Sequence, residues 1–112
     1  MMEIKESRHE GYVTLQPSGE LDANSSILMD EKIQEFIDQE MYRLHIDCSQ
    51  LQYISSAGLG VFISFLDEIN ERGGKFVFSN MSDNVRKVFD LLGLEALVTI
   101  VPTESQVAEA II

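Results

Sequence analysis

The sequence has few residues that crosslink or interrupt a chain. Its 112 residues include one cysteine, Cys48, and two prolines. A single cysteine excludes an internal disulfide and a zinc site built from several cysteines, and a lone thiol fits a reducing compartment. A domain of this length can bury about two-thirds of its unfolded surface. The fold is therefore expected to depend on a packed core.

Positive charge is also scarce. Eight lysines and arginines stand against 19 aspartates and glutamates, so the net charge is −11. Binding to nucleic acid or to an anionic membrane depends on lysine and arginine, and both kinds of partner are therefore disfavoured. A protein partner with a basic face remains compatible with this charge.

Long hydrophobic runs are missing as well. The N-terminal residues 1–6 have no apolar signal region, and the most apolar stretch, residues 57–66, is far shorter than the roughly 18 residues a membrane helix needs. Hydrophobic residues still make up 45% of the chain, which suits a globular protein. We expect one soluble, cytoplasmic domain over residues 1–112, with no metal ion and no cofactor.

The chain begins with two expected strands and then alternates between helices and strands. Residues 3–7 and 12–15 predict an antiparallel hairpin with a turn at 8–11, and the second strand is expected to end at Pro17. Further strands are expected at 44–46, 76–78 and 98–101. A capping box from Thr103 to Gln106 predicts a short C-terminal helix.

Three longer helices are expected between these strands, each from an apolar stripe of helical spacing. The first follows capping residues 24–26, the second begins at Ser55 and Ser56 and ends at residues 73–74, and the third ends at Gly93. The three stripes comprise Met29, Ile33, Phe36, Ile37 and Met41; Leu59, Phe62, Ile63, Leu66 and Ile69; and Val85, Val88, Phe89 and Leu92. Val61 and Phe65 lie outside the second stripe and are expected either to pack against other helices, the favoured alternative, or to extend a partner-binding surface.

The resulting order is β-β-α-β-α-β-α-β-α, which predicts an α/β fold with a mixed, mostly parallel sheet and an N-terminal antiparallel hairpin. In such sheets, functional residues gather where strands end and helices begin. Residues 47–60 form such a junction. The free N–H groups at the helix start favour negative charge, so Ser55 or Ser56 could accept a phosphate there. The alternative is that both serines only cap the helix.

Two motifs resemble those of a known family. The segment YISSAGLG at residues 53–60 resembles the signature of bacterial anti-sigma-factor antagonists, which are small STAS-domain proteins. The segment SGELDA at residues 18–23 resembles the strand-to-helix element near the N-terminus of that family. The expected order of strands and helices also agrees, so the resemblance covers essentially the whole chain.

The resemblance implies a regulatory switch without enzyme activity. The unphosphorylated form would bind an anti-sigma factor with serine kinase activity and release the sigma factor, and a serine phosphatase would restore this form after phosphorylation. The phosphoacceptor corresponds to Ser56. Many family members have aspartate immediately before it, where this chain has Ser55, which leaves Ser55 as a second candidate. The expected partner-binding residues are Asp22, Asn24, Ser55, Ala57, Gly58, Leu59 and Gly60. The alternative within the family is a STAS scaffold subunit of a larger bacterial signalling assembly.

Three enzyme or signalling classes fit less well. A hydrolase elbow needs glycine where Ile54 stands, and His9 and His45 both precede Ser56 in the chain. A receiver domain could use Asp47 as acceptor, but the expected late lysine is missing because Lys87 lies within the third helix. Residues 73–75 lack the first glycine and the final hydroxyl of a phosphate-binding loop.

Overall fold

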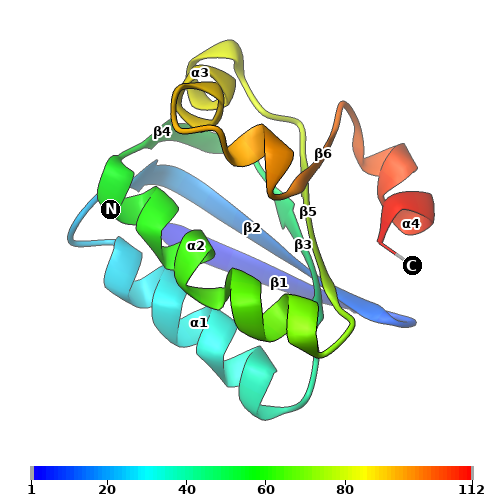
Figure 1. Cartoon of the computed structure of the whole chain (residues 1–112). Helices are drawn as coiled ribbons and strands as arrows, with labels where there is room; N and C mark the ends of the chain where they lie inside the picture. The colour runs from blue at the N-terminus through cyan, green and yellow to red at the C-terminus, as the bar shows by residue number, and fades with distance from the viewer. Residues whose placement is uncertain (1, 112) are drawn as a thin grey trace.

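A single mixed sheet lies at the centre of the computed structural model, which describes residues 2–111 (Figure 1). The strands run in the order β1-β2-β3-β5-β6, and β4 pairs with β2 alone. The β1–β2 pairing is antiparallel and the other pairings are parallel. The elements are β1 Glu3–His9, β2 Tyr12–Leu21, α1 Ser26–Asp38, β3 Arg43–Asp47, β4 Leu51–Ile54, α2 Ser56–Glu71, β5 Lys75–Ser79, α3 Asp83–Leu91, η1 Leu94–Ala96, β6 Thr99–Val101, η2 Glu104–Gln106 and α4 Val107–Ala110.

The expected fold class is confirmed, but β2 does not end at Pro17. Pro17 pairs with Ile4 inside the hairpin, and β2 continues to Leu21. On its other side, β2 pairs with β3 over Val13–Leu15 and with β4 from Gly19 onward. The Gly19 N–H donates to the Gln50 carbonyl, and the nitrogen of Pro17, two residues earlier, faces the same side. Pro17 therefore lies where β2 changes its partner from β3 to β4. No strand needs an N–H donor from β2 at that position, so the proline costs no hydrogen bond of the sheet.

The sequence predicts no strand within the junction at residues 47–60, but the structure has strand β4 there. Its buried residues, Leu51 and Ile54, are separated by two exposed ones, so it has no period-two pattern. The strand forms through pairing with the end of β2, where the register shifts at Gly19 and Glu20. Gly19 has a φ of 105°, which an L residue rarely adopts and which suits a bulge. This pairing places the start of α2 beside the end of β2.

Helices α1 and α2 lie side by side across one face of the sheet (Figure 1). The core between them and the sheet includes Phe62, whose ring meets Phe76 and Phe78 edge to face at 5.8 and 5.0 Å. Val61 and Phe65 are buried, as the favoured alternative predicted. Ile63 was expected in the core but is 45% exposed, because it shares the outer side of α2 with Gly60 and Asp67.

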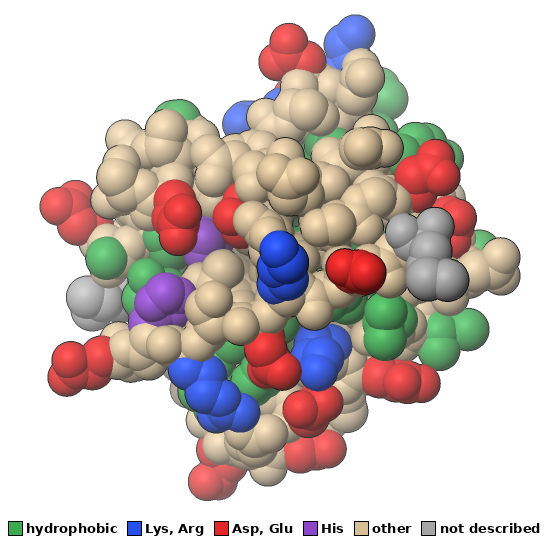
Figure 2. Space-filling model, turned by 180° about the vertical axis from the view of Figure 1, so that it is seen from behind, with side chains coloured by type: hydrophobic (Ala, Val, Ile, Leu, Met, Phe, Trp, Pro, Cys, Tyr) green, Lys and Arg blue, Asp and Glu red, His purple; other side chains and the backbone are tan. Residues whose placement is uncertain are grey.

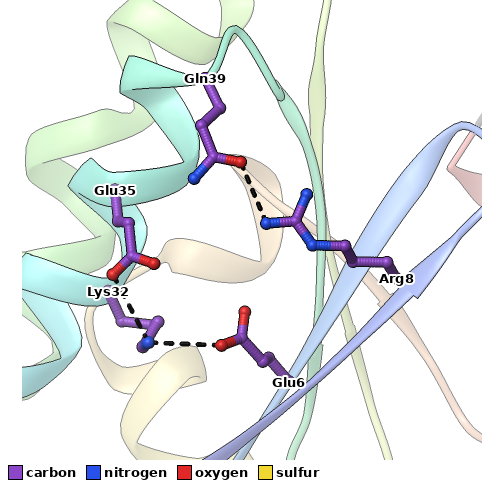
Figure 3. A network of polar contacts seen from close by, with 5 residues as sticks. All are labelled: Glu6, Arg8, Lys32, Glu35 and Gln39. Carbon is purple, nitrogen blue, oxygen red and sulfur yellow. Dashed lines mark hydrogen bonds and ion pairs between the residues drawn. The ribbon is translucent and has the colours of Figure 1, made fainter.

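Polar contacts attach the edge strand β1 to α1 (Figure 3). The Lys32 ammonium lies 3.5 Å from carboxylate oxygens of both Glu6 and Glu35. Arg8 donates to the Gln39 side-chain oxygen at 3.0 Å, and its guanidinium lies 5.2 Å from the centre of the Phe36 ring. Each exposed pair contributes little stability by itself. Together they orient β1 against the helix.

The C-terminal segment packs on the opposite face of the sheet, where Val107 and Ile111 cover Val77. The expected capping box is wrong. Thr103 forms no cap to the helix, and its hydroxyl lies 2.9 Å from the Ser105 hydroxyl. A turn of 3₁₀ helix, η2, lies between Thr103 and α4. Within residues 2–111, no helix is long and apolar enough to cross a membrane.

A chain of hydrogen bonds crosses this second face. His45 is fully buried, with Nδ1 2.8 Å from the Thr14 hydroxyl and Nε2 2.6 Å from the Ser79 hydroxyl. The Thr14 hydroxyl also lies 2.9 Å from His9 Nε2. Figure 2 shows the two histidines close together on this face. Because the ring nitrogens are engaged with hydroxyl groups, the buried imidazole is fully hydrogen-bonded, as a core histidine must be.

We expect acidification to destabilise the protein through His45. Burial lowers the pKa of His45 from its ordinary value, with the charge of Asp47 acting in the opposite direction. Below about pH 6.5 the unfolded chain therefore binds a proton that the folded chain does not. The free energy of unfolding should fall as pH decreases from 7 to 5, by at most about 1.4 kcal/mol per pH unit. Urea unfolding at each pH measures this. The His45→Gln variant should lose the slope, and a flat wild-type profile would contradict the assignment.

Candidate functional site

The start of α2, the end of β4 and the β2–α1 loop meet at one end of the sheet. The Ser55 N–H donates to the Leu21 carbonyl at 2.9 Å and connects the two chain segments. A Cβ added to Gly58 would lie 2.8 Å from the Leu21 oxygen and 2.8 Å from Leu21 Cγ. Only glycine therefore allows α2 to approach the end of β2 this closely.

The two adjacent serines have different surroundings. Ser55 is the N-cap residue of α2, in an extended conformation, and its hydroxyl accepts the Gly58 N–H at 3.2 Å. Ser56 is the first residue of the helix and is exposed. None of the hydrogen bonds formed within residues 2–111 engages the Ser56 hydroxyl. Ser55 thus has a structural role, and Ser56 presents a free hydroxyl at the helix N-terminus, where negative charge is favoured.

The β2–α1 loop is held by Asp22. Its Oδ1 accepts the backbone N–H groups of Asn24 and Ser25, both at 3.0 Å, and lies 3.1 Å from the Ser25 hydroxyl. Hydrogen bonds from the backbone and then the side chain of Ser25 lower the pKa of Asp22. The carboxylate is therefore ionised at neutral pH. Ser25 was expected to cap α1 but makes no side-chain cap bond, because its hydroxyl lies 2.7 Å from the Glu20 carbonyl oxygen.

A hollow of about 420 Å³ opens beside this loop. It combines the acidic side chains of Glu20 and Asp22 with the apolar side chains of Met2 and Leu28. Ile27, next to Leu28 in the first turn of α1, is 62% exposed. The sequence pattern does not predict that Ile27 and Leu28 lie at the surface. The one sign of their exposure in the sequence is the run of three apolar residues at 27–29. A narrow helical stripe cannot bury three consecutive residues, so some of them must face solvent.

The predicted site residues divide into exposed and buried groups. Ala57 and Gly60 are exposed beside Ser56, and Asn24 is exposed on the neighbouring loop. Leu59 is fully buried and Gly58 is buried, so neither presents a side chain at the surface, and their expected contact with a partner stays a prediction. Leu59 anchors α2 in the core. Tyr53, on β4, is 49% exposed and adds an aromatic ring to the accessible surface at this end of the sheet.

The buried Cys48 thiol and the Asp47 carboxylate, which could serve in catalysis, are not available for it. Burial, reinforced by the charge of Asp47, raises the pKa of the Cys48 thiol to about 12, so the thiol is inert at neutral pH. Burial acts to raise the pKa of Asp47, but hydrogen bonds from Ser49, Asn80 and Gln16 outweigh it and lower the pKa. Over residues 2–111, no three His, Cys, Asp or Glu side chains are grouped to hold a metal ion. The arrangement at Ser56 suits modification and binding.

Comparison with known proteins identifies related sequences and folds. Residues 3–110 match the family model described as the STAS domain. The chain is 29% identical to an anti-sigma-B factor antagonist of Listeria monocytogenes, over 94% of this chain and 91% of that protein. A Thermotoga maritima protein of 26% identity superimposes with a TM-score of 0.91, covering 96% of this chain and 93% of its own. The Bacillus cell fate determinant SpoIIAA, solved in a phosphorylated form, has the same fold at 23% identity and a TM-score of 0.75, with 96% and 98% covered.

Proposed function

The chain belongs to the STAS domain family, and we propose that residues 1–112 act as one such domain, an anti-sigma factor antagonist controlled by phosphorylation of Ser56. The observation that carries the proposal is the free Ser56 hydroxyl at the start of α2. The neighbouring β2–α1 loop carries the ionised carboxylate of Asp22. The name of the Listeria monocytogenes relative supports the same function. In this proposal the chain is a binding protein without catalytic activity of its own.

The unphosphorylated form would bind the anti-sigma factor and thereby free the sigma factor. Contact would centre on Ser56, Ala57 and Gly60 at the start of α2, with Ser55 at their margin. Asp22 and Asn24 would present the neighbouring loop. The net charge of −11 and the acidic, partly apolar hollow beside Asp22 favour a partner surface with basic and apolar side chains.

Phosphorylation would exclude the partner by local electrostatics. The anti-sigma factor, acting as a serine kinase, would transfer the γ-phosphoryl group of ATP to Ser56 Oγ. The bond between the γ-phosphorus and the β–γ bridging oxygen breaks, ADP leaves, and the hydroxyl proton passes to a base of the kinase. The phosphate adds about −1.5 to −2 charges beside the Asp22 carboxylate, and it must be desolvated in any interface. The N-terminus of α2 partly offsets its charge, and Ser55 keeps the cap. The domain should thus stay folded while losing its partner, and a serine phosphatase would restore binding.

Affinity capture combined with phosphopeptide mass spectrometry tests the proposal. The chain is isolated from its host in two growth states, and both the modified peptide and the bound proteins are identified. We expect a phosphate on Ser56 whose occupancy changes, and an anti-sigma factor bound only to the unmodified form. Recovery of homologous STAS proteins in place of an anti-sigma factor would favour a scaffold subunit of a signalling assembly. A phosphate on Ser55 alone would contradict the acceptor assignment.

A further inference from the structure

A pocket at the end of the sheet opposite Ser56 is not used by the proposed function. Three connections and the strands that follow them form it: the hairpin turn at Gly11 with Tyr12 of β2, residues 40–42 with Arg43 of β3, and residues 72–74 between α2 and β5. Its volume is about 360 Å³, which is the size of many small-molecule sites. In Figure 1 these connections lie at the lower right, whereas α2 starts at the upper left.

The back wall of this pocket is preformed. The Lys75 N–H donates to the Tyr42 carbonyl at 3.0 Å, which joins the two connections. A Cβ on Gly74 would overlap the backbone of Tyr42, so the two chain segments are in close contact. Gly73 has a φ of 73° and makes the turn that directs the chain from α2 into this contact. A ligand would therefore meet a wall that is already ordered.

Two arginines, Arg43 and Arg72, are among the residues that line the pocket, in a protein that is otherwise strongly acidic. The three ion pairs found within residues 2–111 use Lys32 and Arg86, so neither Arg43 nor Arg72 has a carboxylate partner there. Glu40 is the one acidic side chain among the lining residues. The Arg72 guanidinium lies 5.6 Å from the centre of the Tyr42 ring, which holds it at the pocket wall. The lining thus carries a net positive charge.

The two arginines have different structural settings. Arg72 follows the last residue of α2, where the exposed carbonyl groups of a helix end favour a cation. Arg43 is the first residue of β3 and has no such helix end of its own. A guanidinium group suits the geometry of a carboxylate or a phosphate, and Tyr12 and Tyr42 are aromatic residues of the same lining.

We propose that this pocket binds a small organic anion. Its carboxylate or phosphate group would be held by Arg43 and Arg72, and a flat apolar part of the molecule would pack against Tyr12 and Tyr42. Glu40 would limit the affinity through repulsion of the anion. This site is separate from Ser56 and does not depend on the proposed partner.

Titration of the full ¹⁵N-labelled chain with benzoate and with phenyl phosphate tests the proposal by NMR. Benzyl alcohol, which has the ring without the charge, is the matched ligand control. We expect saturable shifts of the Gly11, Gly73 and Gly74 amides with at least one anion and none with benzyl alcohol. A response to benzoate alone would identify a carboxylate ligand, and a response to phenyl phosphate alone a phosphate. No saturable response to either anion, or an equal response to benzyl alcohol, would overturn the proposal.

Protein variants test the role of charge in the same titration. The double variant Arg43→Gln with Arg72→Gln should bind about a hundredfold more weakly, because it removes two charge-assisted contacts and each contributes about a factor of ten. Glu40→Gln should bind more tightly. Lys87→Gln removes an exposed cation of α3 that forms no ion pair with the described residues 2–111, and it should leave binding unchanged. Unchanged affinity in a folded double variant, as judged from its spectrum, would contradict the assignment.

Discussion

Replacing Ser56 with aspartate is expected to weaken binding of the anti-sigma factor by about two orders of magnitude, or roughly 3 kcal/mol. The added carboxylate would lie at the start of α2 next to the Asp22 loop, whose own carboxylate is ionised. In the interface it would be desolvated and would repel Asp22. Ser56→Ala should bind as the wild type does but should accept no phosphate from the kinase. Isothermal titration calorimetry of each variant against the anti-sigma factor measures the difference.

Ser55→Asp is the matched control for this experiment. It places the same charge on the adjacent residue, but aspartate is also a good N-cap and can accept the Gly58 N–H as Ser55 does. The carboxylate would therefore be turned toward the helix backbone, and binding should fall much less than in Ser56→Asp. Equal losses in the two aspartate variants would show that charge anywhere at this helix start is sufficient. The specific role proposed for Ser56 would then be wrong.

Gly58→Ala should destabilise the fold by about 2 kcal/mol, although alanine is the better helix former. Its Cβ would lie 2.8 Å from the Leu21 carbonyl oxygen and 3.1 Å from a side-chain carbon of Ile54. A backbone oxygen cannot move away as a flexible side chain can. Helix α2 would have to shift away from the end of β2, where Ser55 donates to the same Leu21 carbonyl. Urea-induced unfolding measures the loss.

Gly60→Ala, two residues further along α2, provides the comparison. A Cβ at Gly60 would meet no atom within 4 Å, and the residue is exposed. This variant should gain about 0.5 to 1 kcal/mol, because alanine loses less backbone entropy than glycine in a helix. Equal stability changes in the two variants would show that helix propensity alone determines the effect, and that the close approach of Gly58 to Leu21 carries no cost.

The sequence predicted the helices better than the strands, for a physical reason. Helical stripes and their ends depend on residues a few positions apart, so the start of α2 at Ser56 and the glycine turn after it could be inferred. Strands depend on partners far away in the chain. Leu51 and Ile54 form β4 only because the end of β2 is available to pair with them. Pro17 is tolerated because β2 changes partner beside it.

The candidate site shows the same division. The sequence alone determined a strongly acidic chain with one thiol, a helix starting at two adjacent serines, and motifs that identify the family. Short-range chemistry is sufficient for those features. Only the tertiary structure decided that Ser55 is the cap and Ser56 is free, that Leu59 is buried, and that Arg43 and Arg72 share a pocket. Which side chains are exposed, and which lie close together, depends on packing between segments that are distant in the chain. Local sequence patterns do not predict that packing.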